Sequence, residues 1–389
     1  MSESNPSKAP GYKNVVALGF VSFFTDVSTE MILGILPIYV VTELKASKAA
    51  LGLMEGLAEL ANYVFRLLSG IVSDKIGKRK ILVFIGYSFS SVAKPLFAFA
   101  NTWLDAVVIR TLDRVGKGVR TAPRDALLSQ SVKKEEAGKA FGIHRTLDQS
   151  GAIIGPLLAF IIVPLLGART LFLLSFIPAA AALVVLTFFV VDIATPSVKR
   201  EFFKGAKKVF KGKFLLAIIA LSLFSLGSYN FSFIILRAGE LGIATFALPL
   251  IYMTINITHA LAGYPSGVLA DKIGRENMLV VSMLVFALSS IMLSLLSGSW
   301  VYGVIIALVF GVYQGIYDTV SRAIVPQYAA EEYRGTAYGI YHLVIGLSFL
   351  AGISITGYLW DIYGRFLAFT YSTVMSLISA ILMATIARK

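Results

Sequence analysis

Long apolar runs separated by short polar breaks fill almost the whole chain. They lie near residues 14–41, 49–72, 80–100, 103–127, 138–163, 167–191, 213–237, 245–269, 278–298, 300–327, 336–359 and 364–387. Each run is long enough for a helix that crosses a bilayer, which needs about 20 mostly apolar residues. Residues that commonly end helices, such as Asn101, Gly167 and Gly298, stand at the breaks. The pattern predicts an all-α membrane protein with twelve transmembrane helices.

The composition agrees with a membrane protein. Of the 389 residues, 57% are hydrophobic and 15% are charged, and the mean hydropathy is +0.79. An ordinary soluble domain contains about 25% charged residues, so a soluble enzyme and a disordered chain are both excluded. The chain contains no cysteine, which excludes disulfides, thiolate metal sites and iron–sulfur clusters.

The distribution of basic residues predicts the orientation in the membrane. The formal charge is +13, and most of the 35 Lys and Arg residues lie in segments between alternate runs. Basic residues accumulate on the cytoplasmic side, so a membrane explains the charge without a nucleic-acid partner. The loops expected outside hold few of them, namely Lys45, Lys48, Arg169, Arg237 and Arg365. We expect a multi-pass protein of the plasma (inner) membrane with both termini in the cytoplasm.

A long basic connection over residues 192–213 divides the chain into two parts. We expect this linker to lie in the cytoplasm against anionic lipid headgroups. The division predicts an N-terminal six-helix bundle over 1–191 and a C-terminal six-helix bundle over 214–389.

The two parts repeat each other. The segment GIVSDKIGKRK begins at Gly70, and the similar segment GVLADKIGREN begins at Gly267. The same displacement along the chain relates Gly118 to Gly315. Repeats at one constant displacement predict two pseudo-symmetric bundles.

The chain resembles the major facilitator superfamily of secondary transporters in two features. It has six plus six predicted helices, and the motif G-x-x-x-D-[KR]-x-G-[KR] follows the second and the eighth of them. The resemblance covers essentially the whole chain and implies the major facilitator fold. It also implies that the two motif loops latch one end of the transporter and release it as the halves rock. The implied gating residues are Gly70, Asp74, Gly77, Lys78, Arg79, Gly267, Asp271, Gly274 and Arg275. A role of the basic residues in topology alone stays open.

A second resemblance lies in the fifth run. Gly151, Gly155 and Pro156 match the G-x-x-x-G-P pattern typical of the superfamily's proton-coupled exporters. Two small residues four apart allow a neighbouring helix to approach closely, and a proline inside a helix kinks it. The resemblance adds these residues to the gating set and favours export over import, although close packing alone would also explain them.

A third family motif is present in altered form in the fourth run. Arg110 takes the position of the family's arginine, but Asp113 and Arg114 stand where Gln and Gly are usual. The proton-relay role of that motif therefore does not transfer directly. The segments FFTDVSTEM and RTLDRVGKGVRTAPRDALL look like a subgroup of prokaryotic facilitators whose members mostly lack an assigned substrate.

Many ionisable residues lie inside the apolar runs of the first half. Such a residue costs about 2.5 to 3.5 kcal/mol on insertion scales, so it should face the protein interior or water and have a partner. The cations are Arg66, Lys94, Arg110, Arg114, Lys117, Arg120, Arg124 and Arg145, and the carboxylates are Asp26, Glu30, Glu55, Glu59, Asp113, Asp125 and Asp148. Because the two sets are nearly equal, we expect many of these side chains to form ion pairs.

The carboxylates nearest the middle of the membrane are candidates for proton coupling. They are Asp26, Glu30, Glu59, Asp113 and Asp148. A carboxylate that feels both burial and a nearby cation can change protonation as access alternates. Asp26 and Glu30 lead this set: they share one face of the first helix, that helix lines the cavity in this superfamily, and it contains no basic residue.

The deep polar residues of the second half are mainly neutral. Amide and aromatic groups hold a substrate through hydrogen bonds and stacking. Together with arginines of the first half, the candidate substrate residues are Arg110, Arg114, Arg145, Asn230, Asn256, His259, Tyr313, Gln314 and Tyr317. Packing between helices is the alternative role for each tyrosine. Asp318 and Arg322 are expected to pair, and the separated histidines give no metal site.

The sequence favours a proton-coupled antiporter that exports a small amphipathic molecule by alternating access. It works without a cofactor, and its partners are the substrate, protons and membrane lipid; we expect a monomer. The first alternative is a facilitator or exchanger of organic anions that uses the arginines of the fourth run. A membrane-embedded enzyme or sensor is disfavoured, because the chain contains no P-loop, HExxH or G-x-S-x-G motif and no soluble domain.

Overall fold

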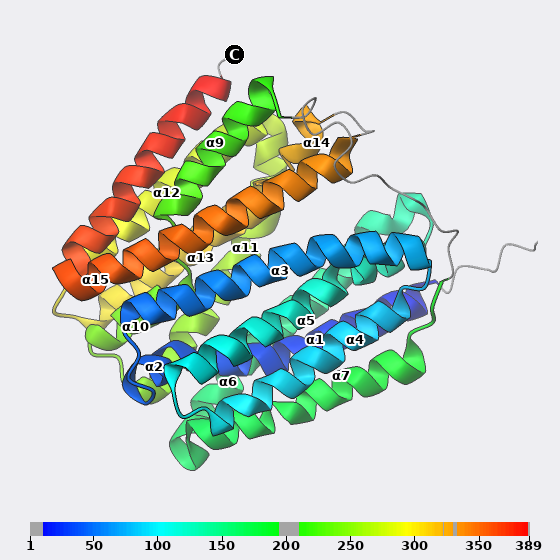
Figure 1. Ribbon diagram of the computed structural model, residues 1–389, viewed down its shortest axis with the longest axis horizontal. Coiled ribbons are helices and arrows are strands. Elements are labelled where there is room, and N and C mark those ends of the chain that lie inside the picture. Colours follow the sequence, from blue (N-terminus) through cyan, green and yellow to red (C-terminus); the bar gives the residue numbers. More distant parts are fainter. Residues whose placement is uncertain (1–10, 194–209, 322, 330–332, 388–389) are drawn as a thin grey trace, which may run out of the picture.

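The first half of the chain folds into long helices joined by short turns. The structure, a computed structural model, describes residues 11–193, 210–321, 323–329 and 333–387. The elements of this half are α1 (Tyr12–Leu33), α2 (Leu36–Thr42), α3 (Lys48–Ile76), α4 (Lys80–Ala93), η1 (Lys94–Phe99), α5 (Trp103–Gln130), η2 (Lys134–Glu136), α6 (Ala137–Leu174) and α7 (Phe176–Phe189). Figure 1 shows them together in blue, cyan and green.

The second half of the chain also folds into long helices joined by short turns. Its elements are α9 (Gly212–Gly227), α10 (Phe231–Glu240), η3 (Thr245–Ala247), α11 (Leu248–Ile273), α12 (Arg275–Leu295), α13 (Trp300–Val320), α14 (Val325–Tyr328) and α15 (Arg334–Ala387). Over the described ranges the chain contains no strand, so the all-α fold is confirmed. Most of the linker predicted at 192–213 lies outside the described residues, and the domain bounds 1–191 and 214–389 stay predictions.

In the part of the chain that the structure describes, eight helical stretches are long and apolar enough to cross a membrane. They are Tyr12–Thr42, Lys80–Phe99, Ala137–Phe189, Gly212–Glu240, Thr245–Ile273, Arg275–Leu295, Trp300–Tyr328 and Arg334–Ala387. Ala137–Phe189 has 53 residues and Arg334–Ala387 has 54, which is enough for two crossings each at about 1.5 Å per residue. The charged helices α3 and α5 correspond to the two remaining predicted runs, so twelve stays the predicted number of crossings.

A glycine interrupts the stretch Ala137–Phe189, and another interrupts the stretch Arg334–Ala387 at the same point of the repeat. Gly167 has φ 78° and Gly364 has φ 81°, and a glycine adopts this backbone conformation without the steric penalty of a side chain. Each therefore forms the turn between two consecutive predicted spans. These turns lie at the breaks that the apolar pattern predicts.

Equivalent glycines pack equivalent helices in the two halves. A Cβ on Gly118 of α5 would stand 2.7 Å from the carbonyl oxygen of Asn62 on α3, and a Cβ on Gly315 of α13 would stand 2.6 Å from that of His259 on α11. Such distances leave no room for a side chain. The same displacement relates all of these positions, so the repeat seen in the sequence is a repeat of helix packing.

Large apolar side chains face outward over the whole molecule. Leu165 is 75% exposed, Phe188 77% and Ile381 68%. Contiguous apolar surface of this extent is rare on soluble monomers and marks a membrane or an interaction surface. Together with the apolar helices, it identifies a multi-pass integral membrane protein.

Candidate functional site

The two leading carboxylates of α1 lie where α6 approaches most closely. A Cβ on Gly151 would stand 3.1 Å from the Cβ of Asp26, and a Cβ on Gly155 would stand 2.9 Å from the Cβ of Glu30. The glycines of the G-x-x-x-G-P motif therefore pack directly against the backbone that carries these carboxylates. Pro156 follows inside α6, where it is buried.

Asp26 and Glu30 remain partly exposed although they lie in the middle of α1. Lys117 of α5 and Lys94 lie within electrostatic range of both carboxylates. Within the described ranges neither carboxylate forms a direct ion pair, and Glu30 Oε2 is buried with no hydrogen-bond partner. Asp26 forms a side-chain hydrogen bond with Asp148, and Glu30 forms one with Tyr252, so neutral or carboxyl partners, and not a bound cation, hold the two groups.

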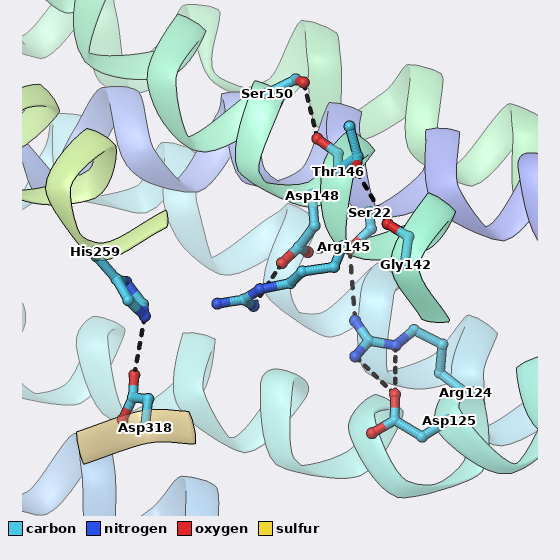
Figure 2. A network of polar contacts seen from close by, with 10 residues as sticks. All are labelled: Ser22, Arg124, Asp125, Gly142, Arg145, Thr146, Asp148, Ser150, His259 and Asp318. Atoms are coloured by element: carbon cyan, nitrogen blue, oxygen red, sulfur yellow. Dashed lines mark hydrogen bonds and ion pairs between the residues drawn. The ribbon is translucent and has the colours of Figure 1, made fainter. Parts of the chain in front are cut away.

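Asp148 of α6 adjoins this pair of carboxylates and is itself well partnered. The hydroxyl of Ser22 donates to its Oδ1 at 2.5 Å, and Arg145 Nη1 donates to its Oδ2 at 3.0 Å. Figure 2 shows these groups converging between α1 and α6, with Arg124 and Asp125 paired nearby at 2.8 Å. Asp26 and Asp148 lie within electrostatic range of each other, so a proton on one changes the energy of a charge on the other.

A fully buried ion cluster connects α3 and α5. Arg110 Nη2 lies 3.0 Å from Glu55 Oε2, and Arg110 Nη1 lies 3.4 Å from Asp113 Oδ2. Asp113 also accepts a hydrogen bond from Ser90. One arginine and two carboxylates, all of them buried, thus pair with one another in a structural ion cluster.

Glu59 and Arg114 lie beside that cluster. Glu59 accepts a hydrogen bond from Asn62 at 3.0 Å and is partly exposed. Arg114 is buried and is surrounded by the charges of Asp113, Glu59 and Glu55. Glu59 is thus reachable, whereas the guanidinium of Arg114 is held among carboxylates of its own half.

The polar candidates of the second half separate into three groups. Asn230 donates to Glu55, and Asn256 donates to the carbonyl of Ala152 on α6 at 2.9 Å; both therefore tie the two halves together. His259 Nε2 lies 3.5 Å from Asp318 Oδ2, as Figure 2 shows. Arg322, expected as the partner of Asp318, lies outside the described residues. Gln314 is half-buried on α13.

Tyr313 belongs to a cluster of aromatic rings inside the second half. Its ring lies 4.8 Å from Phe286 and 5.3 Å from Phe310, centre to centre. Tyr317 lies 5.8 Å from Tyr313, and its hydroxyl is buried without a hydrogen-bond partner in the described part of the chain. The packing alternative therefore suits Tyr313, while Tyr317 keeps a polar group that a ligand can engage.

The first motif loop makes contacts within its own half. Gly77 ends α3 with φ 70°. Arg79 Nη2 lies 3.9 Å from Asp74 Oδ1, and the backbone amides of Arg79 and Lys80 donate to Asp192 beyond α7. Lys78 is exposed. A Cβ on Gly70 would make only ordinary contact with α5.

The second motif loop is built differently. Gly274 turns the chain with φ 91°, and Arg275 Nη1 donates to the carbonyl of Ala323 at 2.7 Å. Asp271 is exposed. Glu276, at the position equivalent to Arg79, accepts hydrogen bonds from Gln327 and Tyr328. Gly267 packs loosely against α13.

Two residues outside the predicted set hold the halves together. Glu55 binds Asn230 and Ser232 of α10, and Asp361 accepts hydrogen bonds from the first amides of α3. Glu55 shares a helical stripe with Glu59, which is a signal for a common polar face. Asp361 carried no signal in the sequence, because an aspartate next to a glycine turn is typical of any loop.

The two related helical halves and the apolar outer surface define a multi-pass membrane protein. The chain belongs to the Major Facilitator Superfamily, whose model matches residues 18–258 and 215–389. This match confirms the family that the repeated loop motif predicts.

Curated relatives and solved structures agree. The uncharacterized MFS-type transporter MJ1317 of Methanocaldococcus jannaschii is 34% identical over 98% of this chain and 97% of its own. Multidrug resistance protein MdtG of Serratia proteamaculans is 24% identical over 75% of this chain and 74% of its own. A crystal structure of a variant of the nucleoside transporter NupG superposes with a TM-score of 0.82 at 13% identity, covering 96% of this chain and 99% of that one; this last likeness is one of fold.

Proposed function

We propose that the protein is a proton-coupled antiporter that exports a small amphipathic molecule by alternating access. The observation that carries the proposal is the state of Asp26 and Glu30: both are deep in α1, partly exposed and without a direct ion pair. Carboxylates in that state can exchange protons with water when the site opens. Those already held in ion pairs, such as Asp113, cannot do so without breaking them.

The cation beside these carboxylates supports competition between proton and substrate. Lys117 lies within range of Asp26 and Glu30 and balances part of their charge when no ligand is bound. A proton on either carboxylate removes one negative charge and weakens the attraction for a bound cation. Proton entry then favours substrate release, which is the exchange an antiporter requires.

The burial of the arginines supports a cationic or neutral substrate over an organic anion. Arg110, Arg114 and Arg120 are buried, whereas Asp26, Glu30 and Glu59 are partly exposed. Lys117 is also partly exposed and Arg145 is exposed, so the three carboxylates support a cationic substrate only beside Asp26, Glu30 and Glu59 themselves. Similarity to a multidrug resistance protein supports export.

The organic-anion alternative keeps one supporting observation. The side chain of Arg145 is 57% exposed although it pairs with Asp148. An anion could displace Asp148 from this guanidinium. Transport that required Arg145 and was indifferent to pH would favour this second function.

The proposal also covers the membrane in which the protein lies, its orientation and its oligomeric state. We propose a plasma-membrane protein with both termini in the cytoplasm, because the basic residues are distributed in that way. We also propose that it acts as a monomer in contact with lipid, because one buried core runs through both halves and apolar side chains cover the outside.

Transport by purified protein in liposomes tests the proposal. A fluorescent lipophilic cation serves as the substrate probe, and a pH gradient is the only driving force. We expect accumulation by the natural protein and by Glu135→Gln, an exposed control, and no gradient-driven accumulation by the double variant Asp26→Asn, Glu30→Gln. Undiminished accumulation by the double variant would overturn the assignment of these carboxylates.

A further inference from the structure

One buried carboxylate is shared between the two halves of the molecule. Glu55 of α3 is 3% exposed. Its Oε2 accepts hydrogen bonds from Arg110 and from Asn230 Nδ2, each at 3.0 Å, and its Oε1 accepts one from Ser232 Oγ at 3.3 Å. Arg110 belongs to the same half as Glu55, whereas Asn230 and Ser232 belong to the other half. A hydrogen bond to a charged group contributes more than one between neutral groups.

The local structure of the second half prepares this contact. The helix is interrupted between α9 and α10, and Asn230 is the N-cap of α10. Its Oδ1 accepts a hydrogen bond from the backbone amide of Ser232 at 3.1 Å, which leaves Nδ2 to donate to Glu55. One side chain thus starts a helix and binds the opposite half, so the donors stand in a fixed position.

A second contact lies at the same end of α3. Asp361 of α15 accepts hydrogen bonds from the backbone amides of Lys48 at 3.0 Å and Ala49 at 2.8 Å. A carboxylate at a helix N-terminus is favoured by the free amides and by the helix dipole. A Cβ on Gly52 would stand 2.5 Å from the carbonyl oxygen of Ile353, so the two helices touch here. This end, where loops with few basic residues lie, is the predicted outer end.

We propose that Glu55 is the positioning residue that holds the predicted outer end closed, and that Arg110 retains its carboxylate when the halves separate. An unpaired charge left in a buried place costs several kcal/mol. Because Arg110 moves with Glu55, opening breaks the bonds to Asn230 and Ser232 without stranding the charge. Asp113, at 3.4 Å from Arg110, belongs to the same half and completes the cluster that stays with Glu55.

This inference requires alternating access but not proton coupling. It therefore stands or falls separately from the roles of Asp26 and Glu30. Glu55 and Asn230 are not in contact with those two carboxylates by any hydrogen bond or ion pair of the described residues.

Distances between spin labels test the closure directly. The chain contains no cysteine, so Thr42→Cys and Ser297→Cys, exposed positions at the predicted outer end of each half, can be labelled alone. Asn230→Asp keeps an oxygen for the helix cap and places a carboxylate against Glu55. Ser232→Ala removes the other donor. Asn277→Asp, exposed at the opposite end, is the matched control.

We expect the ratio of outer-open to outer-closed molecules to rise about tenfold or more in Asn230→Asp and in Ser232→Ala. This factor corresponds to the loss of one hydrogen bond to a charged group. The control should leave the distance distribution unchanged. Thermal unfolding of each variant shows whether it is folded. Unchanged distances in both folded variants would overturn the proposal, as would an equal shift in the control.

Discussion

Gly155 of α6 lies directly against Glu30 of α1: a Cβ placed on the glycine would stand 2.9 Å from the Cβ of the glutamate. The backbone nitrogen of Met31 would be closer still, at 2.8 Å. Backbone cannot retreat from such a contact without moving the helix. The glycine that resembles the exporter motif therefore determines where the proposed proton-binding face of α1 lies.

A side chain at position 155 should disturb both stability and transport. Gly155→Leu forces α1 and α6 apart, and overpacking of this kind costs about 1 to 3 kcal/mol. We expect a lower midpoint of thermal unfolding and loss of pH-driven transport. Gly142→Ala on the same helix is the control, because a Cβ there meets nothing within 4 Å. Normal transport by Gly155→Leu would show that the contact is irrelevant to coupling.

Tyr313 should behave as a packing residue. It is 7% exposed among Phe286, Phe310 and other rings, so Tyr313→Phe should keep binding and transport of the probe near the natural level. Tyr313→Ala should destabilise the second half by about 3 to 5 kcal/mol, as large truncations in aromatic cores do. Binding measured by fluorescence and unfolding measured by heat separate the two roles. A folded Tyr313→Phe variant that no longer bound the probe would restore Tyr313 to the substrate site.

Arg145 and Asp318 should pair across the halves when the predicted cytoplasmic end closes. Asn256 of α11 donates to the carbonyl of Ala152 on α6, so the two halves touch at this point. Arg145 lies two helical turns from Ala152. His259, the partner of Asp318, lies about one turn from Asn256. The side chains of Arg145 and Asp318 are 57% and 41% exposed. In this structure Arg145 pairs with Asp148 of its own half, and Asp318 pairs with His259 of its own half.

Charge exchange tests this pairing. We expect Asp318→Asn to slow transport about fivefold, which corresponds to roughly 1 kcal/mol for a partly exposed pair. The exchange variant Arg145→Asp, Asp318→Arg should transport faster than Arg145→Asp alone, measured as initial rates in liposomes. An exchange variant no faster than the single variant would contradict the cross-half pair.

The helical fold could be predicted because its signals are local. Apolar runs of about 20 residues, the turn glycine Gly167 and the repeated motif loops each depend on a few neighbouring positions. The break before α10 could not be predicted. Ser228 and Asn230 are polar but lie inside the predicted run 213–237, and polar residues inside a run do not by themselves mark a helix end. At this break Asn230 caps α10 and donates to Glu55.

The site could be predicted in part for a physical reason. Membrane insertion makes buried charge costly, so the sequence alone indicates which residues need partners, and Arg110 with Asp113 is one such pair. It does not indicate which partner each one takes. Glu55 faces the other half, and Asp318 of α13 lies beside His259 of α11. These choices depend on distances between different helices, whereas Arg145 pairs with Asp148 three residues along the same helix.

The central claim is that Asp26 and Glu30 exchange protons as the substrate moves. The most direct measurement uses liposomes loaded with the fluorescent cation and an internal pH-sensitive dye, with no initial pH gradient. Outflow of the cation through the natural protein should shift the internal pH as protons move in the opposite direction. Asp26→Asn, Glu30→Gln mimics the state in which both carboxylates are protonated, so any remaining flow of the cation through this variant should leave the internal pH unchanged. A pH shift that persists in the double variant, or cation flow through the natural protein with no shift at all, would contradict the account.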